Sequence, residues 1–296
     1  MFSLALLGVS LAVAGDGDVE ASLWRGDAGP VHVLWAPDLA IMGAGFGGYL
    51  LLRDLGGGHA GAVSDPHGLD AIGQPTWSPR AGAASDFFGH ALKYKGLNMP
   101  VLSMVGVGVF GGLRHGAGVA SGLGAGSAYF LVSIEALALN LGVTEALKVG
   151  VGRPRPYTSV AFQEAYPEVY ASEEVQETFG ADSHGEAYKS WPSGHTSSSA
   201  ATSFCAATLI WRDLRASGAP PWVAGLSYGA ATALTATTGF LRVKAGWHHT
   251  TDVVSGGVLG AAIGTGVALW HTTGALQPSV ARSEDGAPTL SVGGVW

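Results

Sequence analysis

After Pro37 the chain is a succession of apolar segments with helical spacing, and this pattern limits the fold more than any other feature. Period-two alternation, the mark of half-buried strands, is scarce in this region. We therefore predict an all-α protein, a helix bundle of about six core helices. The predicted helices cover residues 38–54, 84–95, 99–114, 122–150, 193–215, 221–241 and 249–271.

The composition agrees with tightly packed apolar helices. Charged residues make up 12% of the 296 residues and hydrophobic residues 47%, and there are 47 glycines. Small residues let helices approach closely, in membranes above all. The net charge is −7 and no extended basic patch is present, which excludes nucleic acid as a partner. Cys205 is the single cysteine, so no intrachain disulfide can form.

The relation of the bundle to a membrane stays open at this stage. Segments 222–241 and 253–270 approach the length of about 20 residues that a span needs, and neither carries a charge. The same helices could form the buried core of a soluble enzyme. Lysines and arginines do not favour one orientation. We favour a secreted soluble or membrane-associated protein over an integral one with six spans, which remains an alternative.

The N-terminal residues 1–14 are predicted to be a signal peptide. A short apolar run ends in Ala12-Val13-Ala14, which is typical of a cleavage site, and polar sequence follows at once. The run has no Lys or Arg before it, so the alternative is an apolar helix that stays attached. The signal peptide predicts export, either to the periplasm or to a membrane.

The remaining chain divides into three parts. Residues 15–83 form an N-terminal segment with one apolar helix and a Gly- and Pro-rich loop, residues 84–272 a helical domain, and residues 273–296 a tail with strand-like alternation at 289–292. Within the helical domain, residues 157–191 are an acidic insert. An insert of this length is either a functional loop, here a lid, or a solvated excursion. Its acidic residues are Glu164, Glu168, Glu173, Glu174, Glu177, Asp182 and Glu186.

Three short stretches carry the chemistry, and the last in the chain is Arg242-x5-His248-x3-Asp252. On a helix, His248 and Asp252 would share a face. A carboxylate there can fix one imidazole tautomer and leave the other nitrogen free to attack. His249, three residues before Asp252, is a rival for this role. Taken alone, such a pair is more often an ordinary surface pair.

The second stretch is Pro192-Ser193-Gly194-His195, at a predicted helix start with Ser190 as the capping residue. The free backbone N–H groups of a helix start bind anions, and Gly194 allows a phosphate to come close. His195 would lie beside that anion and could protonate a leaving group. An ordinary helix cap followed by a core histidine is an equally good reading of this stretch alone.

The first stretch is Lys148-x6-Arg155-Pro156, at the broken end of a predicted helix. Arginine offers a planar fork that matches phosphate oxygens, whereas lysine acts as a point charge. Arg153, two residues before Arg155, is not assigned to the site. On its own, this stretch would be interpreted as a basic surface turn.

Together, in this order, the stretches resemble the three signature motifs of the type 2 phosphatidic acid phosphatase and vanadium haloperoxidase superfamily. One position departs from the pattern, because Leu241 stands where the family usually has Ser. The resemblance covers roughly residues 84–272. The segment from Lys189 to Thr196 is also similar to the signature of bacterial class A acid phosphatases, which are secreted.

The resemblance implies that the motifs meet at one end of the bundle. His248 would attack phosphorus to form a phosphohistidine, Asp252 would orient it, and His195 would protonate the leaving alcohol and later activate water. No metal would be needed, because positive and hydrogen-bonding groups would bind the phosphate oxygens. These groups are Lys148, Arg155, Ser193, Gly194 and Arg242.

We therefore predict a metal-independent histidine phosphatase acting on a phosphorylated small molecule or a lipid phosphate. One alternative is a vanadium-dependent haloperoxidase, in which the same residues would hold vanadate as a cofactor. A second is a non-catalytic envelope protein that binds anions. The sequence indicates neither the substrate nor the oligomeric state.

Overall fold

The computed structural model describes residues 31, 33, 35–55, 67–90, 98–173, 175–176, 186–272, 277–282 and 288–293. The predicted signal peptide lies outside them, as do residues 91–95 of one predicted helix. In the described part the chain is an all-α bundle, as predicted. Its α-helices are α1 (Trp35–Leu52), α2 (Pro79–Gly89), α3 (Met99–His115), α4 (Val119–Val151), α5 (Val160–Ala165), α6 (Pro167–Tyr170), α8 (Gly194–Ala216), α9 (Pro221–Lys244) and α10 (Thr250–Thr272).

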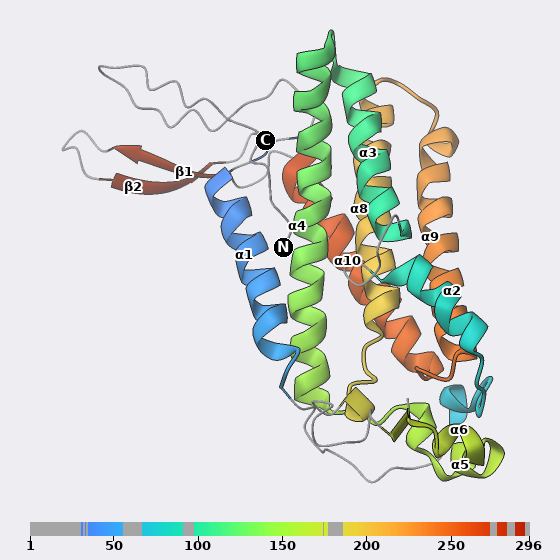
Figure 1. Cartoon of the computed structure of the whole chain (residues 1–296). Coiled ribbons are helices and arrows are strands. Elements are labelled where there is room, and N and C mark those ends of the chain that lie inside the picture. The colour runs from blue at the N-terminus through green and yellow to red at the C-terminus, as the bar shows by residue number, and fades with distance from the viewer. Residues whose placement is uncertain are drawn as a thin grey trace.

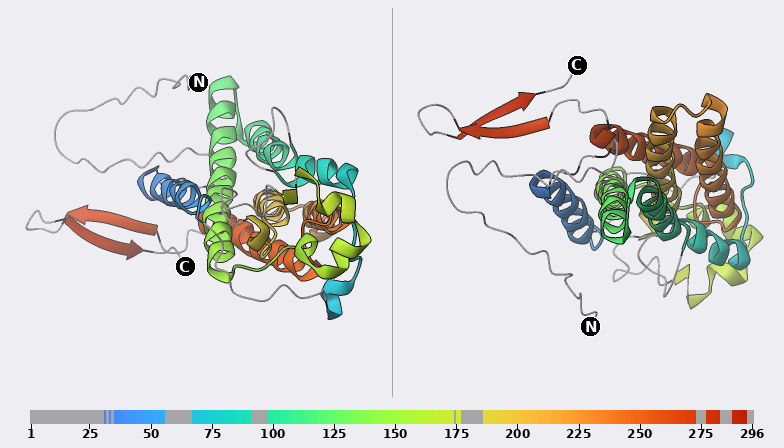
Figure 2. Two further views of the ribbon diagram at one scale, coloured as in Figure 1. Left: turned by 60° about the horizontal axis from the view of Figure 1, so that its bottom comes forward. Right: turned by 90° about the horizontal axis from the view of Figure 1, so that it is seen from above.

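The long helices form two layers (Figures 1 and 2). Helices α1, α4 and α3 lie side by side in one layer, and α10, α8 and α9 in the other. Helix α8 contacts α10 and α9 in its own layer and also packs on α4 and α3. The short helix α2 packs across α9 and α8.

Helices α8 and α10 touch through their backbones, and this contact positions the site. A Cβ atom on Gly256 would lie 2.6 Å from the carbonyl oxygen of Ser193. Gly260 and Gly264 face the backbone of α8 in the same way, one and two turns further on. Only small residues allow such an approach. The first turns of the two helices, which carry His195 and Asp252, are thereby held against each other.

One helix begins earlier than predicted. The apolar pattern predicts a helix from residue 84, but α2 begins at Pro79. Ser78 is its N-cap, and the Ser78 side chain accepts a hydrogen bond from the N–H of Ala81. Proline at the first helical position is favoured because its missing N–H is not needed there. The start is therefore set by capping residues that lie outside the apolar pattern.

The acidic insert packs on the bundle with an aromatic core. Tyr157, Phe162, Val175 and Ala187 are buried together, against partly buried aromatic residues that include Trp247. The helices α5 and α6 of the insert lie across the lower end of the bundle in Figure 1. This part of the insert is therefore packed, whatever the role of its acidic residues.

The tail forms a hairpin of β1 (Gln277–Arg282) and β2 (Pro288–Gly293), antiparallel, with Gln277 opposite Gly293. The strand-like alternation at 289–292 falls within β2. Among the described residues, two helical stretches, Val119–Ala165 and Thr250–Thr272, are long and apolar enough to cross a membrane by length and composition.

Candidate active site

The three motifs meet at one end of the bundle. Helices α4 and α9 end there and α8 and α10 begin there, at the bottom of Figure 1. A cavity of about 900 Å³ opens at this end. Among its lining residues are Asp86, Lys148, Arg155, His195, Arg242 and His248.

His248 presents one imidazole nitrogen to this cavity. Its side chain is 2% exposed, and Nδ1–H donates a hydrogen bond to the carbonyl oxygen of Ser190 at 2.8 Å. This tautomer leaves a lone pair on Nε2. Burial lowers the pKa of His248 to about 3, against hydrogen bonding to Asp252 that raises it. The imidazole is therefore neutral at physiological pH, which is the form that a nucleophile requires.

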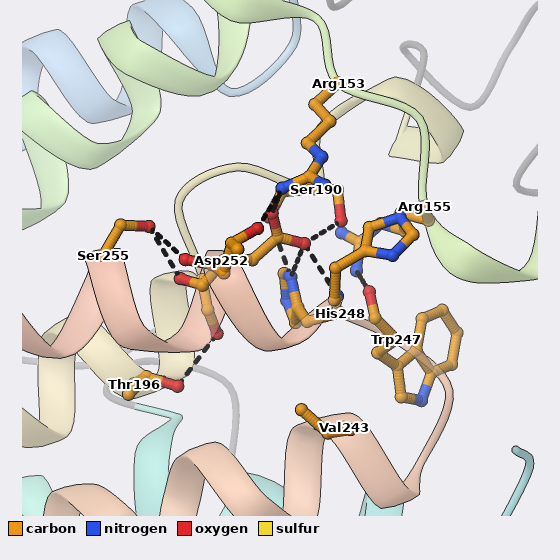
Figure 3. A network of polar contacts seen from close by, with 12 residues as sticks. Arg153, Arg155, Ser190, Thr196, Val243, Trp247, His248, Asp252 and Ser255 are labelled. Atoms are coloured by element: carbon orange, nitrogen blue, oxygen red, sulfur yellow. Dashed lines mark hydrogen bonds and ion pairs between the residues drawn. The ribbon is translucent and has the colours of Figure 1, made fainter. Parts of the chain in front are cut away.

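Asp252 lies behind His248, and both of its carboxylate oxygens accept hydrogen bonds (Figure 3). Its Oδ1 accepts a hydrogen bond from Arg153 Nη1 at 2.6 Å, and its Oδ2 accepts from Ser190 Oγ at 2.5 Å. The Nδ1 atom of His248 is 3.6 Å from Oδ2. Asp252 thus holds Ser190 by its hydroxyl group, while the carbonyl of Ser190 holds the imidazole. The carboxylate orients His248 mainly through Ser190.

His249 is turned away from the cavity. Its backbone N–H donates to Asp252 Oδ2 at 2.9 Å, and its ring Nε2 lies 3.3 Å from the carbonyl oxygen of Pro154. It is absent from the cavity lining. The geometry favours His248 over His249 as the group that faces a substrate.

His195, in the first turn of α8, pairs with a carboxylate that the motifs do not contain. Its Nε2 lies 2.9 Å from Oδ1 of Asp86, which is on α2. His90 stacks edge-on against the His195 ring, with 4.8 Å between centroids. Burial, followed by the positive charge of Arg242, lowers the pKa of His195 well below its usual value. Without an anion in the cavity, His195 is therefore neutral.

Two buried guanidinium groups lie over one tryptophan ring. The Cζ atoms of Arg155 and Arg242 lie 5.6 and 5.7 Å from the centre of the Trp247 ring. Burial, and then repulsion by Arg155, lower the pKa of Arg242 to about 9. Arg242 Nε has no hydrogen-bond partner among the described residues. Two like charges and a spare buried donor are the features of a site built for an anion.

Carboxylates balance part of this positive charge. Arg155 Nη2 bonds Glu186 of the insert at 2.9 Å, and Arg242 Nη1 lies 3.5 Å from Asp86. Lys148 Nζ lies 3.2 Å from Glu145, and the same carboxylate binds the fully buried Lys189 at 3.1 Å. Three of the cations that line the cavity, Lys148, Arg155 and Arg242, thus have acidic partners that hold them in place.

Of the glycine and the serine of the second motif, only the glycine lines the cavity. Gly194 lines the cavity, and a Cβ atom there would be 3.2 Å from Lys148 Nζ. The first N–H groups of α8 have no partner within the helix and are free for an anion. Ser193 is fully buried, its hydroxyl is 3.0 Å from Thr196 Oγ1, and it is absent from the lining. The Ser193 side chain, which was predicted to bind phosphate, therefore does not line the cavity in this structure.

The predicted capping role of Ser190 is wrong. Helix α8 begins at Gly194 with Ser193 as its N-cap, so Ser190 lies too far from the helix start to cap it. Its hydroxyl bonds Asp252 instead. Arg153, left unassigned from the sequence, binds Asp252 and Asp70. Asp86 was missed because a single acid in an apolar helix, some 60 residues before the first motif, carries no local signal.

Fold and site together define an all-α protein with a histidine-based anion site suited to phosphoryl transfer. The model of the PAP2 superfamily matches residues 129–275, which include all three motifs. The chain belongs to this superfamily, whose members are generally hydrolases of the phosphatase type, with haloperoxidase-like activity also represented. No curated protein and no solved structure matches the chain.

Proposed function

We propose that the protein is a phosphatase that hydrolyses phosphomonoesters through a phosphohistidine at His248, without a catalytic metal. The observation that carries this proposal is the pair of buried arginines, Arg155 and Arg242, beside a neutral imidazole with a free nitrogen. A phosphate between them would replace their mutual repulsion with attraction. It would also bring phosphorus next to His248.

In the first step, His248 Nε2 forms a bond to phosphorus and the bond to the leaving oxygen breaks. His195 would give that oxygen a proton. The negative charge of a bound phosphate raises the pKa of a nearby imidazole, so substrate itself would prepare His195 as the acid. The Asp86 carboxylate, 2.9 Å away, would stabilise the imidazolium.

In the second step, neutral His195 takes a proton from water, whose oxygen attacks phosphorus. The bond between His248 Nε2 and phosphorus breaks, phosphate leaves, and the imidazole of His248 is regenerated. Asp252 and Ser190 would keep the imidazole in place while it carries charge. Lys148, Arg155, Arg242 and the first N–H groups of α8 would stabilise the equatorial oxygens.

Surface hydrophobicity favours a lipid-linked phosphate as the substrate class. On α9, Trp222 is 71% exposed and Phe240 61%, and the helix between them carries no charge. Eighteen residues of helix extend about 27 Å, close to the hydrocarbon core of a bilayer. Leu50, 55% exposed, brings apolar surface to the cavity itself. We propose that this face contacts lipid and that the cavity opens at the membrane surface.

The test compares two substrates for the purified protein, a soluble chromogenic phosphate and a phosphatidate in vesicles. The proposal expects phosphate release from both substrates, faster from phosphatidate, and inhibition of both reactions by vanadate. EDTA, added at a temperature well below the unfolding temperature, should cause no loss of activity. Loss of activity to EDTA and its return with a divalent cation would exclude the mechanism. Bromide oxidation with vanadate and peroxide, without phosphate release, would establish the haloperoxidase alternative.

A further inference from the structure

Three buried ionisable side chains meet in the upper half of the bundle, away from the cavity. Asp38 of α1, Glu135 of α4 and His271 of α10 are each no more than 3% exposed. His271 Nε2 lies 2.8 Å from Glu135 Oε2 and 3.9 Å from Asp38 Oδ1. One donor atom from each residue lies within 4.8 Å of the others. Three helices thus contribute one ligand atom each.

The cluster takes no part in the proposed hydrolysis. His271 is 19 residues after Asp252 on α10, which corresponds to about 28 Å along the helix. None of the three residues lines the large cavity. Such a group needs another explanation, because burying carboxylates costs free energy that apolar side chains of the same size would not cost.

A small space adjoins the two carboxylates. It measures about 10 Å³ and is lined by Asp38 and Glu135 together with apolar side chains that include Val33 and Met42. This volume is close to that needed for one water molecule. A cation between the three donor atoms could therefore keep one water as its fourth ligand.

We propose that Asp38, Glu135 and His271 bind a structural divalent metal ion, and that Zn²⁺ fits the donor set best. Zinc takes imidazole nitrogen and carboxylate oxygen in sites of four ligands, and three protein ligands with one water is a common arrangement. Its charge balances two carboxylates while the imidazole stays neutral. Calcium and magnesium need six or more oxygen ligands, which the apolar walls do not offer.

The metal would join α1 to the bundle. Helix α1 contacts α4, where Gly45 approaches the backbone at Ala138 so closely that a Cβ atom would not fit. Tyr49, in the lower part of α1, and Arg53, directly after the helix, line the cavity. A metal ion shared by Asp38, Glu135 and His271 would link the upper end of α1 to α4 and α10. The lower end of α1 borders the cavity.

The test measures metal in the full-length protein purified without chelator and then exposed to Zn²⁺. We expect about one zinc ion per chain, with nitrogen and oxygen ligands at about 2.0–2.2 Å by X-ray absorption. Chelation should lower the unfolding temperature of the wild-type protein, since metal bound only to the folded state stabilises it. His271→Ala and Glu135→Gln should lose both the zinc and the effect of the chelator.

Two control variants separate this site from other histidines. His115→Ala changes a histidine that pairs with Asp213, and His248→Ala changes the cavity, so both should keep the zinc. Wild-type protein that binds no zinc and unfolds at the same temperature with and without chelator would overturn the proposal. Zinc that is lost with His248→Ala would place the metal in the cavity and overturn it as well. The wild-type measurements decide the question even where a variant fails to fold.

Discussion

Arg153 Nη1 lies 2.6 Å from Oδ1 of Asp252, which makes this arginine the support of the carboxylate behind His248. The same guanidinium reaches Asp70, in the short 3-10 helix Gly68–Ala71 before α2. Arg155, two residues on, turns into the cavity instead. The two arginines of one short segment therefore differ in position, since one holds the carboxylate behind His248 and the other faces the cavity.

This difference predicts different kinetic effects. Arg153→Ala should lower kcat by about 10- to 100-fold with little change in KM, because a misplaced nucleophile costs rate and leaves binding intact. Arg155→Ala should raise KM and lower kcat, since it removes contacts with the phosphate itself. Steady-state kinetics on one soluble phosphate distinguishes the two. Arg80→Ala, at an exposed position, is the matched control. Equal effects on KM in both variants would contradict the assignment.

The identity of the nucleophile can be tested with neighbouring histidines. His248→Ala should lose about four orders of magnitude in kcat or more, as enzymes do when a nucleophile is removed. His249→Ala should keep most activity, because its backbone N–H, which binds Asp252, remains. Phosphate trapped on the protein, labile to acid and stable to base, should disappear only in the first variant. Trapped phosphate in His248→Ala would exclude His248.

Asp86 should control the protonation of His195. Asp86→Asn keeps the shape of the side chain but removes the negative charge 2.9 Å from His195 Nε2. The imidazolium then loses a stabilising partner, so the pKa of His195 falls further. The alkaline limb of the kcat–pH profile should move to lower pH, and kcat at pH 7 should fall by about 10- to 100-fold. Glu164→Gln, an exposed change, is the control. An unchanged pH profile would mean that Asp86 only positions Arg242.

Stability should fall on acidification because of the buried histidines. The pKa of His248 is about 3 in the folded protein, against about 6.5 for an ordinary histidine. Between these values the unfolded chain binds a proton that the folded chain does not, so the unfolding free energy decreases as pH falls. From pH 7.5 to pH 5, His248 alone should account for about 2 kcal/mol. The lowered pKa of His195 acts in the same direction.

Denaturant unfolding at the two pH values measures this loss. His248→Asn has no titrating group at the position and should lose about 2 kcal/mol less than the wild type over the same range. The measurement should be made without phosphate, because a bound anion raises the pKa of nearby histidines. A variant with the same pH dependence as the wild type would show that folding does not lower the pKa of His248.

The sequence predicts those parts of the site whose spacing is local. His248 and Asp252 are four residues apart, and Lys148 and Arg155 flank one helix end, so a short pattern identifies each pair. The helix on which His248 and Asp252 would share a face begins only at Thr250, so His248 lies just before α10. The long helices follow from apolar periodicity in the same way. Asp86 and Arg153 act through partners that only tertiary packing brings near. The roles of Arg153 and Ser190 depend on side-chain directions in loops, which no periodicity encodes, and that of Asp86 depends on how α2 packs against α8 and α9.

The insert, predicted to be either a lid or a solvated excursion, contributes packing that reaches the cavity. Phe162 is fully buried, with its ring 5.8 Å from Trp77 and 6.5 Å from Tyr157. Both of these rings contact Trp247, at 5.6 and 5.5 Å between centroids. Trp247 in turn lies under the guanidinium groups of both cavity arginines. The aromatic residues thus connect the insert to the anion-binding groups.

Phe162→Ala should therefore disturb binding as well as stability. The lost packing should cost about 3–5 kcal/mol of unfolding free energy. Because Trp247 loses its support, the arginines should be placed less well and KM for a small phosphate should rise by about tenfold. Thermal unfolding and steady-state kinetics measure the two effects, with Val160→Ala, at a position 53% exposed, as the control in the same helix. A loss of stability with an unchanged KM would show that the aromatic core only holds the insert on the bundle.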